Sequence, residues 1–296
     1  MRGPGLIITA DDFGLHPSVN RAVELAHREG VLAATSLMVG APAAADAVAR
    51  GRACPRLRVG LHLVLADGRP TLPPAAIPDL VDAGGRLRAQ TQAGMAREGL
   101  RFFSLPRVRR QLALEIRAQF AAFAATGLAL DHVNAHKHFH LHPTVLALIV
   151  AIGREFGLRA VRLPRETGLP PWLRPWLAMQ RARLAAAGIA HNDYIVGVRQ
   201  SGRFDTAALL RALHGLPRTG IGELYLHPAL ESGAAIAPSM PAYRHADEFA
   251  ALVSPRVAWA RDCLQAQGYR FGGFSDLAAP ARAPPLAPAP ASSSCS

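Results

Sequence analysis

Short apolar runs rich in β-branched residues alternate with amphipathic, helix-like segments along most of this 296-residue chain. Such repeats of a strand followed by a helix predict an α/β fold on a parallel sheet, either open or closed into a barrel. We expect strands at residues 6–10, 34–39, 57–65, 130–135, 159–163, 222–226 and 269–274. We expect helices at residues 18–29, 43–50, 106–126, 143–156, 205–213 and 245–267, the last with a break near Pro255.

The segments outside this pattern define the domain organisation. Residues 66–104 are rich in Pro and Gly, so we expect a long excursion with little regular structure there. Residues 166–190 form an apolar and basic insert. Residues 279–296 are rich in Ala and Pro and end in Ser-Ser-Ser-Cys-Ser, which is typical of a disordered tail. The sequence therefore predicts a single domain over residues 1–278, followed by that tail.

Cysteine content and hydropathy exclude several classes of protein. Cys54, Cys263 and Cys295 lie too far apart for a disulfide framework or a CxxC zinc site, which favours a reducing compartment. The N-terminus lacks the layout of a signal peptide, and the apolar stretch at residues 145–152 is too short to span a bilayer. We therefore expect a cytoplasmic protein.

The chain carries 33 Lys and Arg against 21 Asp and Glu, which gives a net charge of +12. Such an excess of positive charge can attract nucleic acid or an anionic membrane surface. Alternatively, it consists of Arg residues scattered over a solvated surface, and we favour this second interpretation. The sequence has no zinc-finger spacing and no aromatic RNA-binding signature, so we expect no nucleic-acid partner. Peripheral contact with an inner membrane remains a possible use of the charge.

Two adjacent carboxylates, Asp11 and Asp12, follow the first predicted strand. Parallel α/β folds bind ligands at the carboxyl ends of their strands, and neighbouring carboxylates there are costly unless a cation or hydrogen bonds relieve them. A bend at the strand end would turn both side chains toward one site. Alternatively, an Asp at this position caps the helix that follows. This segment alone leaves both interpretations open.

Two further strands carry isolated His residues. His62 lies inside an apolar strand, where a single His is more often a hydrogen-bonded core residue than a metal ligand. Glu223, Tyr225 and His227 share one face of a later strand. His227 ends that strand, so it either serves as a general acid or base or faces solvent.

Residues 131–143, with the sequence DHVNAHKHFHLHP, hold five of the twelve His. In an extended chain all five would project to one face with Asn134, an arrangement that lacks a packing rationale but suits a metal ion. A pH-sensitive polar surface strip is the alternative. Because Pro143 starts a helix, we expect the strand to end near His136. One or two of these His should then bind metal, and the others should contact substrate or orient the ligands.

One carboxylate and two His at neighbouring strand ends match an open catalytic metal site that has room for water and substrate. Such ligands accept Zn, Co, Ni or Fe, and Mg less readily. The sequence contains no P-loop, no G-x-G-x-x-G and no G-x-S-x-G. Nucleotide binding and a serine nucleophile therefore lack support.

Four motifs together resemble those of the YdjC-like (ChbG-type) carbohydrate deacetylases: TADDFG at residues 9–14, GLHL at 60–63, HKHFH at 136–140 and LHP at 226–228. The resemblance covers roughly residues 5–277. Three further stretches are similar to the family's subgroup associated with hopanoid biosynthesis: residues 40–46, 131–143 and 243–248.

The resemblance implies a TIM-barrel-like (β/α) barrel, regular or distorted and incomplete, often a homodimer, with one divalent metal ion. Carried over to matching positions, it implies Asp12, His62 and His136 as metal ligands, Asp11 as catalytic base and His227 as proton donor. His138 and His140 stay open as alternatives to His136, because the His run is longer than the ligand count requires. Substrate contacts are expected from His138, His140, Arg244, Trp172 and Trp176.

For the hopanoid subgroup, the implied reaction removes the N-acetyl group from N-acetylglucosamine carried on bacteriohopanetetrol, a membrane lipid. A chitooligosaccharide or another N-acetylated sugar is a second possible substrate, and a non-catalytic metal- or lipid-binding module is a third possibility. Trp172 and Trp176 lie near helical spacing among Arg residues of the insert, which predicts a basic amphipathic segment that touches the membrane or covers the hopanoid. A lid or ordinary core packing is an equal alternative.

Overall fold

The computed structural model describes residues 3–88, 91–166, 173–231, 236 and 240–278. In this part of the chain the strands are β1 (Gly5–Phe13), β2 (Ala34–Leu37), β3 (Arg58–Leu63), β4 (Val133–Ala135), β5 (Tyr194–Val196), β6 (Ile221–Leu226) and β7 (Arg270–Phe271). The α-helices are α1 (Pro17–Glu29), α2 (Ala44–Ala53), α3 (Gln92–Ser104), α4 (Pro106–Ala125), α5 (Pro143–Gly153), α6 (Leu173–Ala186), α7 (Thr206–His214), α8 (His245–Leu252), α9 (Pro255–Ala266) and α10 (Phe274–Leu277). The 3₁₀ helices are η1 (Pro74–Ala76), η2 (His136–Leu141) and η3 (Arg154–Phe156).

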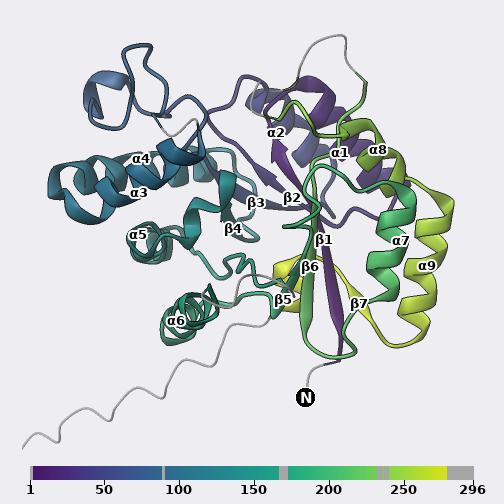
Figure 1. Ribbon diagram of the computed structural model, residues 1–296. Coiled ribbons are helices and arrows are strands. Elements are labelled where there is room, and N and C mark those ends of the chain that lie inside the picture. The colour runs from purple at the N-terminus through teal and green to yellow at the C-terminus, as the bar shows by residue number, and fades with distance from the viewer. Residues whose placement is uncertain (1–2, 89–90, 167–172, 232–235, 237–239, 279–296) are drawn as a thin grey trace, which may run out of the picture.

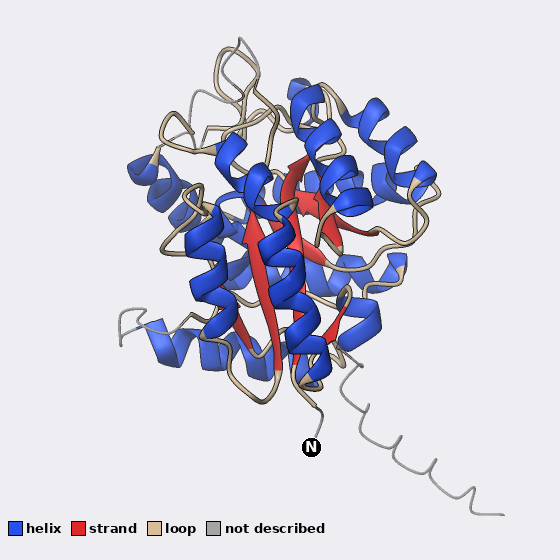
Figure 2. Ribbon diagram, turned by 90° about the vertical axis from the view of Figure 1, so that its right-hand side faces the viewer, coloured by secondary structure: helices blue, strands red, loops and turns tan. Residues whose placement is uncertain are grey.

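β1 lies at the centre of a curled parallel sheet with the order β4-β3-β2-β1-β6-β5, and β7 pairs with the start of β1 (Figure 1). β1 pairs with β6 over residues 5–10 and with β2 from Thr9 onward. Every residue of β1 is buried, as expected for a parallel strand that is covered on both faces. Helices pack around the strands, as Figure 2 shows.

β4 and β5 are the two ends of the sheet order, and irregular backbone that includes residues 159–163 lies between them. Residues 159–163 were predicted to be a strand, but within the described chain they make isolated parallel bridges, from Val161 to Val133 and from Ala160 to Ala190. The short strand β5 was not predicted, because three residues are too few to show a period. The α/β fold is therefore a distorted, incomplete barrel of the TIM-like type, as the resemblance implied.

α4 confirms the longest predicted helical stripe. Pro106 occupies the first helical position, where its missing N–H costs no hydrogen bond. The helix packs against β3. All five residues of the predicted stripe are buried: Val108, Leu112, Ile116, Phe120 and Phe123. The recurrence of apolar residues at a period close to the 3.6 residues of a helical turn was therefore sufficient to predict this helix.

The prediction of little regular structure over residues 66–104 was wrong at its end, where α3 forms. The Thr91 side chain caps this helix by accepting a hydrogen bond from the Gly94 N–H at 3.0 Å. Phe102 packs against Phe139, with 5.7 Å between ring centroids. α3 carries few buried apolar residues, so no clear stripe marked it in the sequence.

The described part of the insert contains helix α6, which buries Leu177 and Leu184. Trp176 is half-buried, and its indole N–H donates a hydrogen bond to the Leu141 carbonyl at 3.0 Å. Trp172 and the predicted tail at residues 279–296 lie outside the described residues. None of the described helices combines the length and apolarity needed to cross a membrane.

Candidate metal centre and active site

β1 ends in an irregular turn that carries Asp11 and Asp12. Its register with β2 shifts between Ala10 and Phe13, and Asp12 adopts a left-handed backbone with φ of 64°. Such a conformation is uncommon outside glycine and is concentrated at functional sites. The bend at the strand end is therefore confirmed. The capping interpretation is wrong, because His16 is the residue that caps α1.

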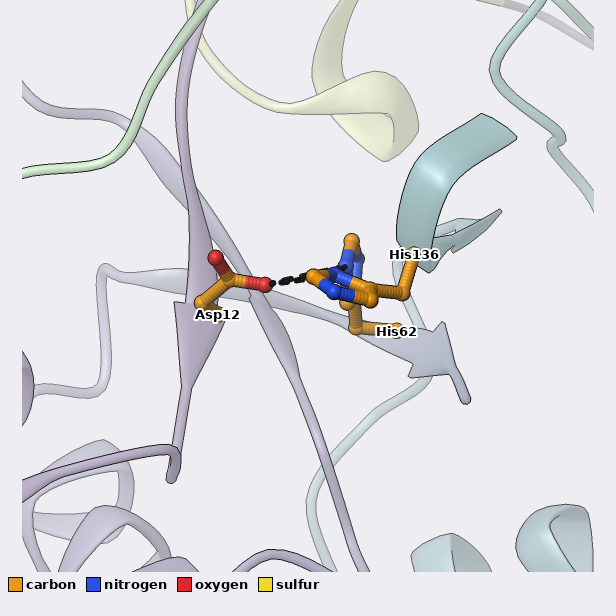
Figure 3. Close-up of side chains that lie close together, drawn as sticks. All are labelled: Asp12, His62 and His136. Carbon is orange, nitrogen blue, oxygen red and sulfur yellow. Dashed lines mark hydrogen bonds and ion pairs between the residues drawn. The ribbon is translucent and has the colours of Figure 1, made fainter. Parts of the chain in front are cut away.

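Three buried side chains, which three strands of the sheet carry or lead into, converge on one point (Figure 3). Asp12 ends β1, His62 lies on β3, and His136 follows β4. The Asp12 Oδ1 atom lies 3.2 Å from His62 Nε2 and 3.1 Å from His136 Nδ1. The two imidazole nitrogens are 3.4 Å apart. One carboxylate and two imidazoles within 4.8 Å of one another form a donor set that could hold a divalent metal ion.

The far side of the His62 ring is fixed by a polar partner. Its Nδ1 atom lies 2.6 Å from Asn134 Oδ1 and 3.0 Å from Ser36 Oγ. Because the amide oxygen can only accept, His62 donates from Nδ1, which leaves the Nε2 lone pair directed at Asp12 and His136. Such a partner behind the ring is what orients an imidazole metal ligand.

Electrostatics at this cluster also favour a bound cation. Asp12 Oδ2 is buried and has no hydrogen-bond partner among the described residues. Burial lowers the pKa of His136, but the adjoining Asp12 carboxylate outweighs it and raises that pKa to about 9. A buried carboxylate with an unused oxygen, which draws a proton onto its neighbour, is a site that stabilises positive charge. The residues therefore fit a metal ion.

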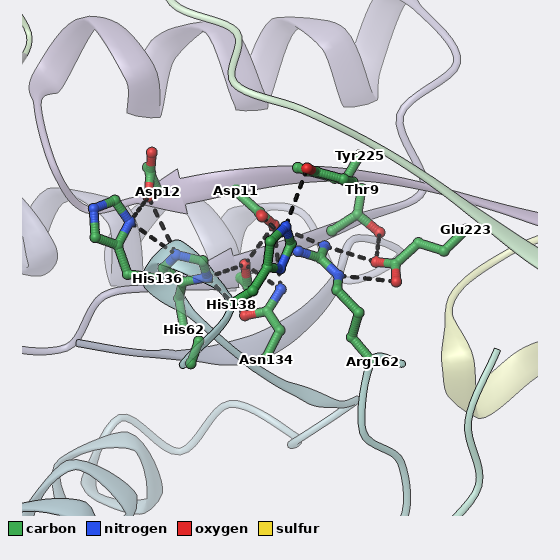
Figure 4. A network of polar contacts seen from close by, with 12 residues as sticks. Thr9, Asp11, Asp12, His62, Asn134, His136, His138, Arg162, Glu223 and Tyr225 are labelled. Atoms are coloured by element: carbon green, nitrogen blue, oxygen red, sulfur yellow. Dashed lines mark hydrogen bonds and ion pairs between the residues drawn. The ribbon is translucent and has the colours of Figure 1, made fainter. Parts of the chain in front are cut away.

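Asp11 belongs to a second buried network, centred on Arg162 (Figure 4). The guanidinium donates to both Asp11 oxygens, at 2.6 and 2.9 Å, and to both Glu223 oxygens, at 2.9 and 2.7 Å. Thr9 donates to Glu223, and Arg162 lies 4.8 Å from the centroid of the Tyr225 ring. Burial raises the pKa of Asp11, but Arg162 outweighs it and holds that pKa well below its ordinary value. Asp11 is therefore ionised at neutral pH.

His227 follows β6 and is held by Glu248 of α8. The His227 backbone N–H donates to Glu248 Oε2 at 2.5 Å, and the ring Nδ1 lies 4.0 Å from the same oxygen. The ring contacts Tyr225 and Tyr243 edge-on, with centroid distances of 5.6 and 4.9 Å. Burial lowers the pKa of His227 to about 4, so its imidazole is neutral at pH 7.

The other His of residues 131–143 do not share the face that an extended chain would give them, because the chain leaves β4 after Ala135. Lys137 and His138 adopt left-handed backbone conformations in η2. His138 reaches Tyr225, with 3.2 Å between its Nε2 and the hydroxyl oxygen. Burial, with the nearby Arg162, lowers the pKa of His138 to about 3.

Three of these His have structural partners instead. His132 stacks on Phe274 with 4.7 Å between ring centroids. His140 accepts a hydrogen bond from the Ala135 N–H at 3.1 Å, and His142 precedes α5. The strand end near His136 is therefore confirmed, whereas the shared face of all five His is wrong.

Two adjoining cavities surround these groups. The first, of about 290 Å³, is lined by both candidate catalytic residues, two of the three candidate ligands, His138 and two tyrosines: Asp11, His62, His136, His138, Tyr225, His227 and Tyr243. The second, of about 640 Å³, is mostly apolar and is lined by Leu15, Met38, Val64 and Ile236 among others. His136 and Met240 line both cavities, so the apolar cavity begins at the candidate metal centre.

Several residues expected near the substrate lie elsewhere in the described chain. His140 is buried and does not line the first cavity. Arg244 is exposed and pairs with Asp247 at the start of α8. Trp176 contacts the Leu141 carbonyl rather than either cavity.

Four residues of the site were missed by sequence reasoning: Ser36, Arg162, Tyr243 and Glu248. Arg162 had one signal, because it is one of two arginines in the otherwise apolar run LRAVRL at residues 158–163, and a cation buried there needs carboxylate partners. The Glu248 carboxylate had none, because an acidic residue in the first turn of a helix is ordinary.

The chain is similar over most of its length to bacterial deacetylases. It is 29% identical over 278 residues to a carbohydrate deacetylase of Brevibacillus brevis, covering 92% of this chain and 99% of that one. It is 28% identical over 274 residues to a chitooligosaccharide deacetylase of Yersinia pestis, covering 92% of this chain and 98% of that one.

The fold also matches a solved structure. The crystal structure of a candidate cellobiose-phosphate cleavage protein from Enterococcus faecalis V583 superposes with a TM-score of 0.73 and 22% identity, over 94% of this chain and all of that one. This likeness concerns the fold alone. The model of the YdjC-like protein family matches residues 5–262, and the chain therefore belongs to the YdjC-like family.

Proposed function

We propose that this protein is a metal-dependent carbohydrate N-deacetylase. The observation that carries the proposal is the convergence of Asp12, His62 and His136 beside a second buried carboxylate, Asp11, at one cavity. Two imidazoles and one carboxylate leave coordination positions for water and substrate. The deacetylases of Brevibacillus brevis and Yersinia pestis, similar over nine-tenths of the chain, support the same reaction class.

A divalent cation held by Asp12, His62 and His136 would lower the pKa of a water molecule and polarise the acetamide carbonyl. Zn is the ion we favour, and Co, Ni, Fe and Mg are alternatives. Asp11 remains ionised beside Arg162, so its carboxylate can accept the proton of the attacking water as a general base.

His227 faces the same cavity and can pass a proton to the departing amine. Its imidazole starts the cycle neutral, because burial lowers its pKa to about 4. The first proton of the attacking water goes to Asp11, so the proton that His227 passes on must be the second one, which the tetrahedral adduct gives up as it collapses to acetate. When the C–N bond breaks, acetate and the free amine of the sugar leave.

The apolar cavity beside His136 favours a substrate that carries an apolar group next to its acetamido sugar. Its volume of about 640 Å³ falls within the range of sites that enclose whole small molecules. We propose an N-acetylglucosaminyl hopanoid as that substrate, with the hydrocarbon in the apolar cavity and the sugar at the metal centre. A chitooligosaccharide, which is the substrate named for the Yersinia pestis relative, is the second candidate.

The substrate is tested by mass spectrometry after the purified protein is incubated with each candidate. We expect loss of one acetyl group from the glycosyl hopanoid at a kcat/KM well above that for diacetylchitobiose. Faster deacetylation of diacetylchitobiose would reject the glycolipid and keep the deacetylase. No deacetylation of either compound by metal-loaded protein would contradict the proposed reaction for these substrates.

The roles of the two adjacent carboxylates are tested by a matched pair of substitutions. We expect Asp11→Asn to keep its metal and to lose about 10²- to 10⁴-fold in kcat, the contribution typical of a general base. Asp12→Asn should lose the metal itself, measured by elemental analysis of the purified protein. Loss of metal from Asp11→Asn would make Asp11 a ligand and overturn its role as base.

A further inference from the structure

Three of the five large hydrophobic side chains that are exposed in the described chain lie together where α3 meets α4. Leu100 and Phe103 leave 67% and 63% of their surface exposed, and Leu105 leaves 44%. Leu100 and Phe103 are three positions apart on α3, so they share its outer side. The neighbouring Phe102 faces inward and is 2% exposed. We use the name α3–α4 face for Leu100, Phe103 and Leu105 together with four arginines around them: Arg97, Arg107, Arg109 and Arg110.

Positive charge surrounds these apolar side chains. Arg97 and Arg107 leave 70% and 76% of their side chains exposed, and Arg109 and Arg110 are exposed on the first turns of α4. Arg109 donates to the Phe103 carbonyl at 2.9 Å, which holds its guanidinium against the apolar group.

The acidic residues nearby cancel only part of this charge. Glu98 is buried beneath α3, where Arg101 donates to it at 2.6 Å. Asp79 pairs with Arg107 and is itself mostly covered. The α3–α4 face therefore presents exposed apolar side chains within an excess of exposed arginine.

The same helix also reaches the catalytic cavity. Met95, in the first turn of α3, lines the cavity that holds Asp11 and His227. Phe103 lies eight residues further along, about 12 Å at the helical rise of about 1.5 Å per residue. A surface bound to the α3–α4 face would therefore lie close to the entrance of the active site.

We propose that the α3–α4 face docks this protein on an anionic lipid bilayer. Exposed Leu and Phe enter the interfacial layer of a bilayer, and arginines around them attract anionic headgroups. A second copy of this chain is a poorer partner, because a symmetric interface would bring the same arginines against one another. We place the membrane contact on this surface rather than on α6, because the α6 residue Trp176 is half-buried and hydrogen-bonded to the Leu141 carbonyl.

Co-sedimentation of the full chain with vesicles tests the proposal without any substrate, so the result does not depend on the proposed reaction. The vesicles are phosphatidylcholine alone or phosphatidylcholine with about a third phosphatidylglycerol. We expect binding to the anionic vesicles that weakens with salt. Leu100→Ser with Phe103→Ser should lower the partition coefficient about tenfold or more. Arg97→Gln with Arg110→Gln should lower it about fivefold for each charge removed.

The chain offers a matched control on the opposite side of the molecule, where α9 carries Trp259, 70% exposed, and Arg256 (Figure 1). Trp259→Ser with Arg256→Gln changes the same kinds of exposed side chain and should leave vesicle binding unchanged. Circular dichroism checks that each variant is folded. Equal binding by wild type and all variants, or absence of binding to anionic vesicles, would overturn the proposal. A wild-type dimer that Leu100→Ser with Phe103→Ser dissociates, seen by light scattering, would make this face an interface between copies instead.

Discussion

Glu248 is a buried carboxyl group whose titration should be visible in the stability of the whole protein. It is fully buried, and its two oxygens accept the backbone N–H groups of Phe204 and His227 at 3.1 and 2.5 Å. Burial raises its pKa from 4.5 to about 7, against the opposing effect of those N–H donors. The substitution Glu248→Gln keeps the shape of the side chain and removes this titration.

The sign and size of the effect follow from proton linkage. Between pH 4.5 and 7 the folded protein keeps the Glu248 proton while the unfolded chain loses it, so the folded state binds more protons. The free energy of unfolding contributed by this group therefore falls as pH rises through that window. At about 1.4 kcal/mol per pH unit, the whole titration amounts to about 3 kcal/mol, of which about 2.5 kcal/mol falls between pH 5 and 8.

Urea unfolding of wild type and Glu248→Gln at intervals from pH 5 to 8 measures this contribution, because the other titrating groups cancel in the difference. The variant also loses one N–H acceptor, which costs about 1–3 kcal/mol at every pH. We expect its deficit to be largest at pH 5 and to shrink by about 2.5 kcal/mol at pH 8. A difference that does not change with pH would refute the reasoning, because Glu248 would then be ionised in the folded protein throughout.

Two further substitutions test the packing and charge around the site. Gly60→Ala would place a Cβ 2.6 Å from the His132 ring and 2.7 Å from its carbonyl oxygen, so we expect a loss of about 1–3 kcal/mol in the free energy of unfolding, measured by urea unfolding. An unchanged midpoint of urea unfolding would contradict this expectation, because β3 and β4 would then move apart at no cost to make room for the added methyl group. Arg162→Met leaves Asp11 and Glu223 buried without their cation, and we expect it to cost about 3–5 kcal/mol in the same assay. Arg162→Lys, which keeps the charge but loses the paired geometry, should cost less, and equal losses would show that charge is not what Arg162 supplies.

The sequence was sufficient for those parts of the fold that bury a periodic stripe. β1 and α4 were predicted because one is apolar throughout and the other repeats apolar residues near every fourth position. α3 was missed because much of its apolar surface is exposed, and residues 159–163 were taken as a strand although they form isolated bridges. An apolar run shows that a segment is buried, but it does not show how its backbone groups are paired.

The same distinction holds at the site. Asp11, Asp12, His62, His136 and His227 were predicted as polar residues at strand ends, and the parallel sheet brings all of them to one region. The remaining His could not be sorted by spacing, because two left-handed residues after β4 redirect the chain. Backbone conformations of that kind depend on contacts across the fold, which a linear pattern does not contain.

Arg162 explains how two adjacent carboxylates can have different partners. Without it, ionised Asp11 and Asp12 side by side in a buried site would repel, and one of them would take up a proton. The guanidinium instead occupies both oxygens of Asp11 from one side, while Asp12 faces two imidazoles and keeps one oxygen unpaired. The Arg162 guanidinium therefore neutralises Asp11, whereas Asp12 keeps one buried oxygen that has no hydrogen-bond partner among the described residues. This division supports the proposed roles, in which Asp12 is a metal ligand and Asp11 beside it is the general base.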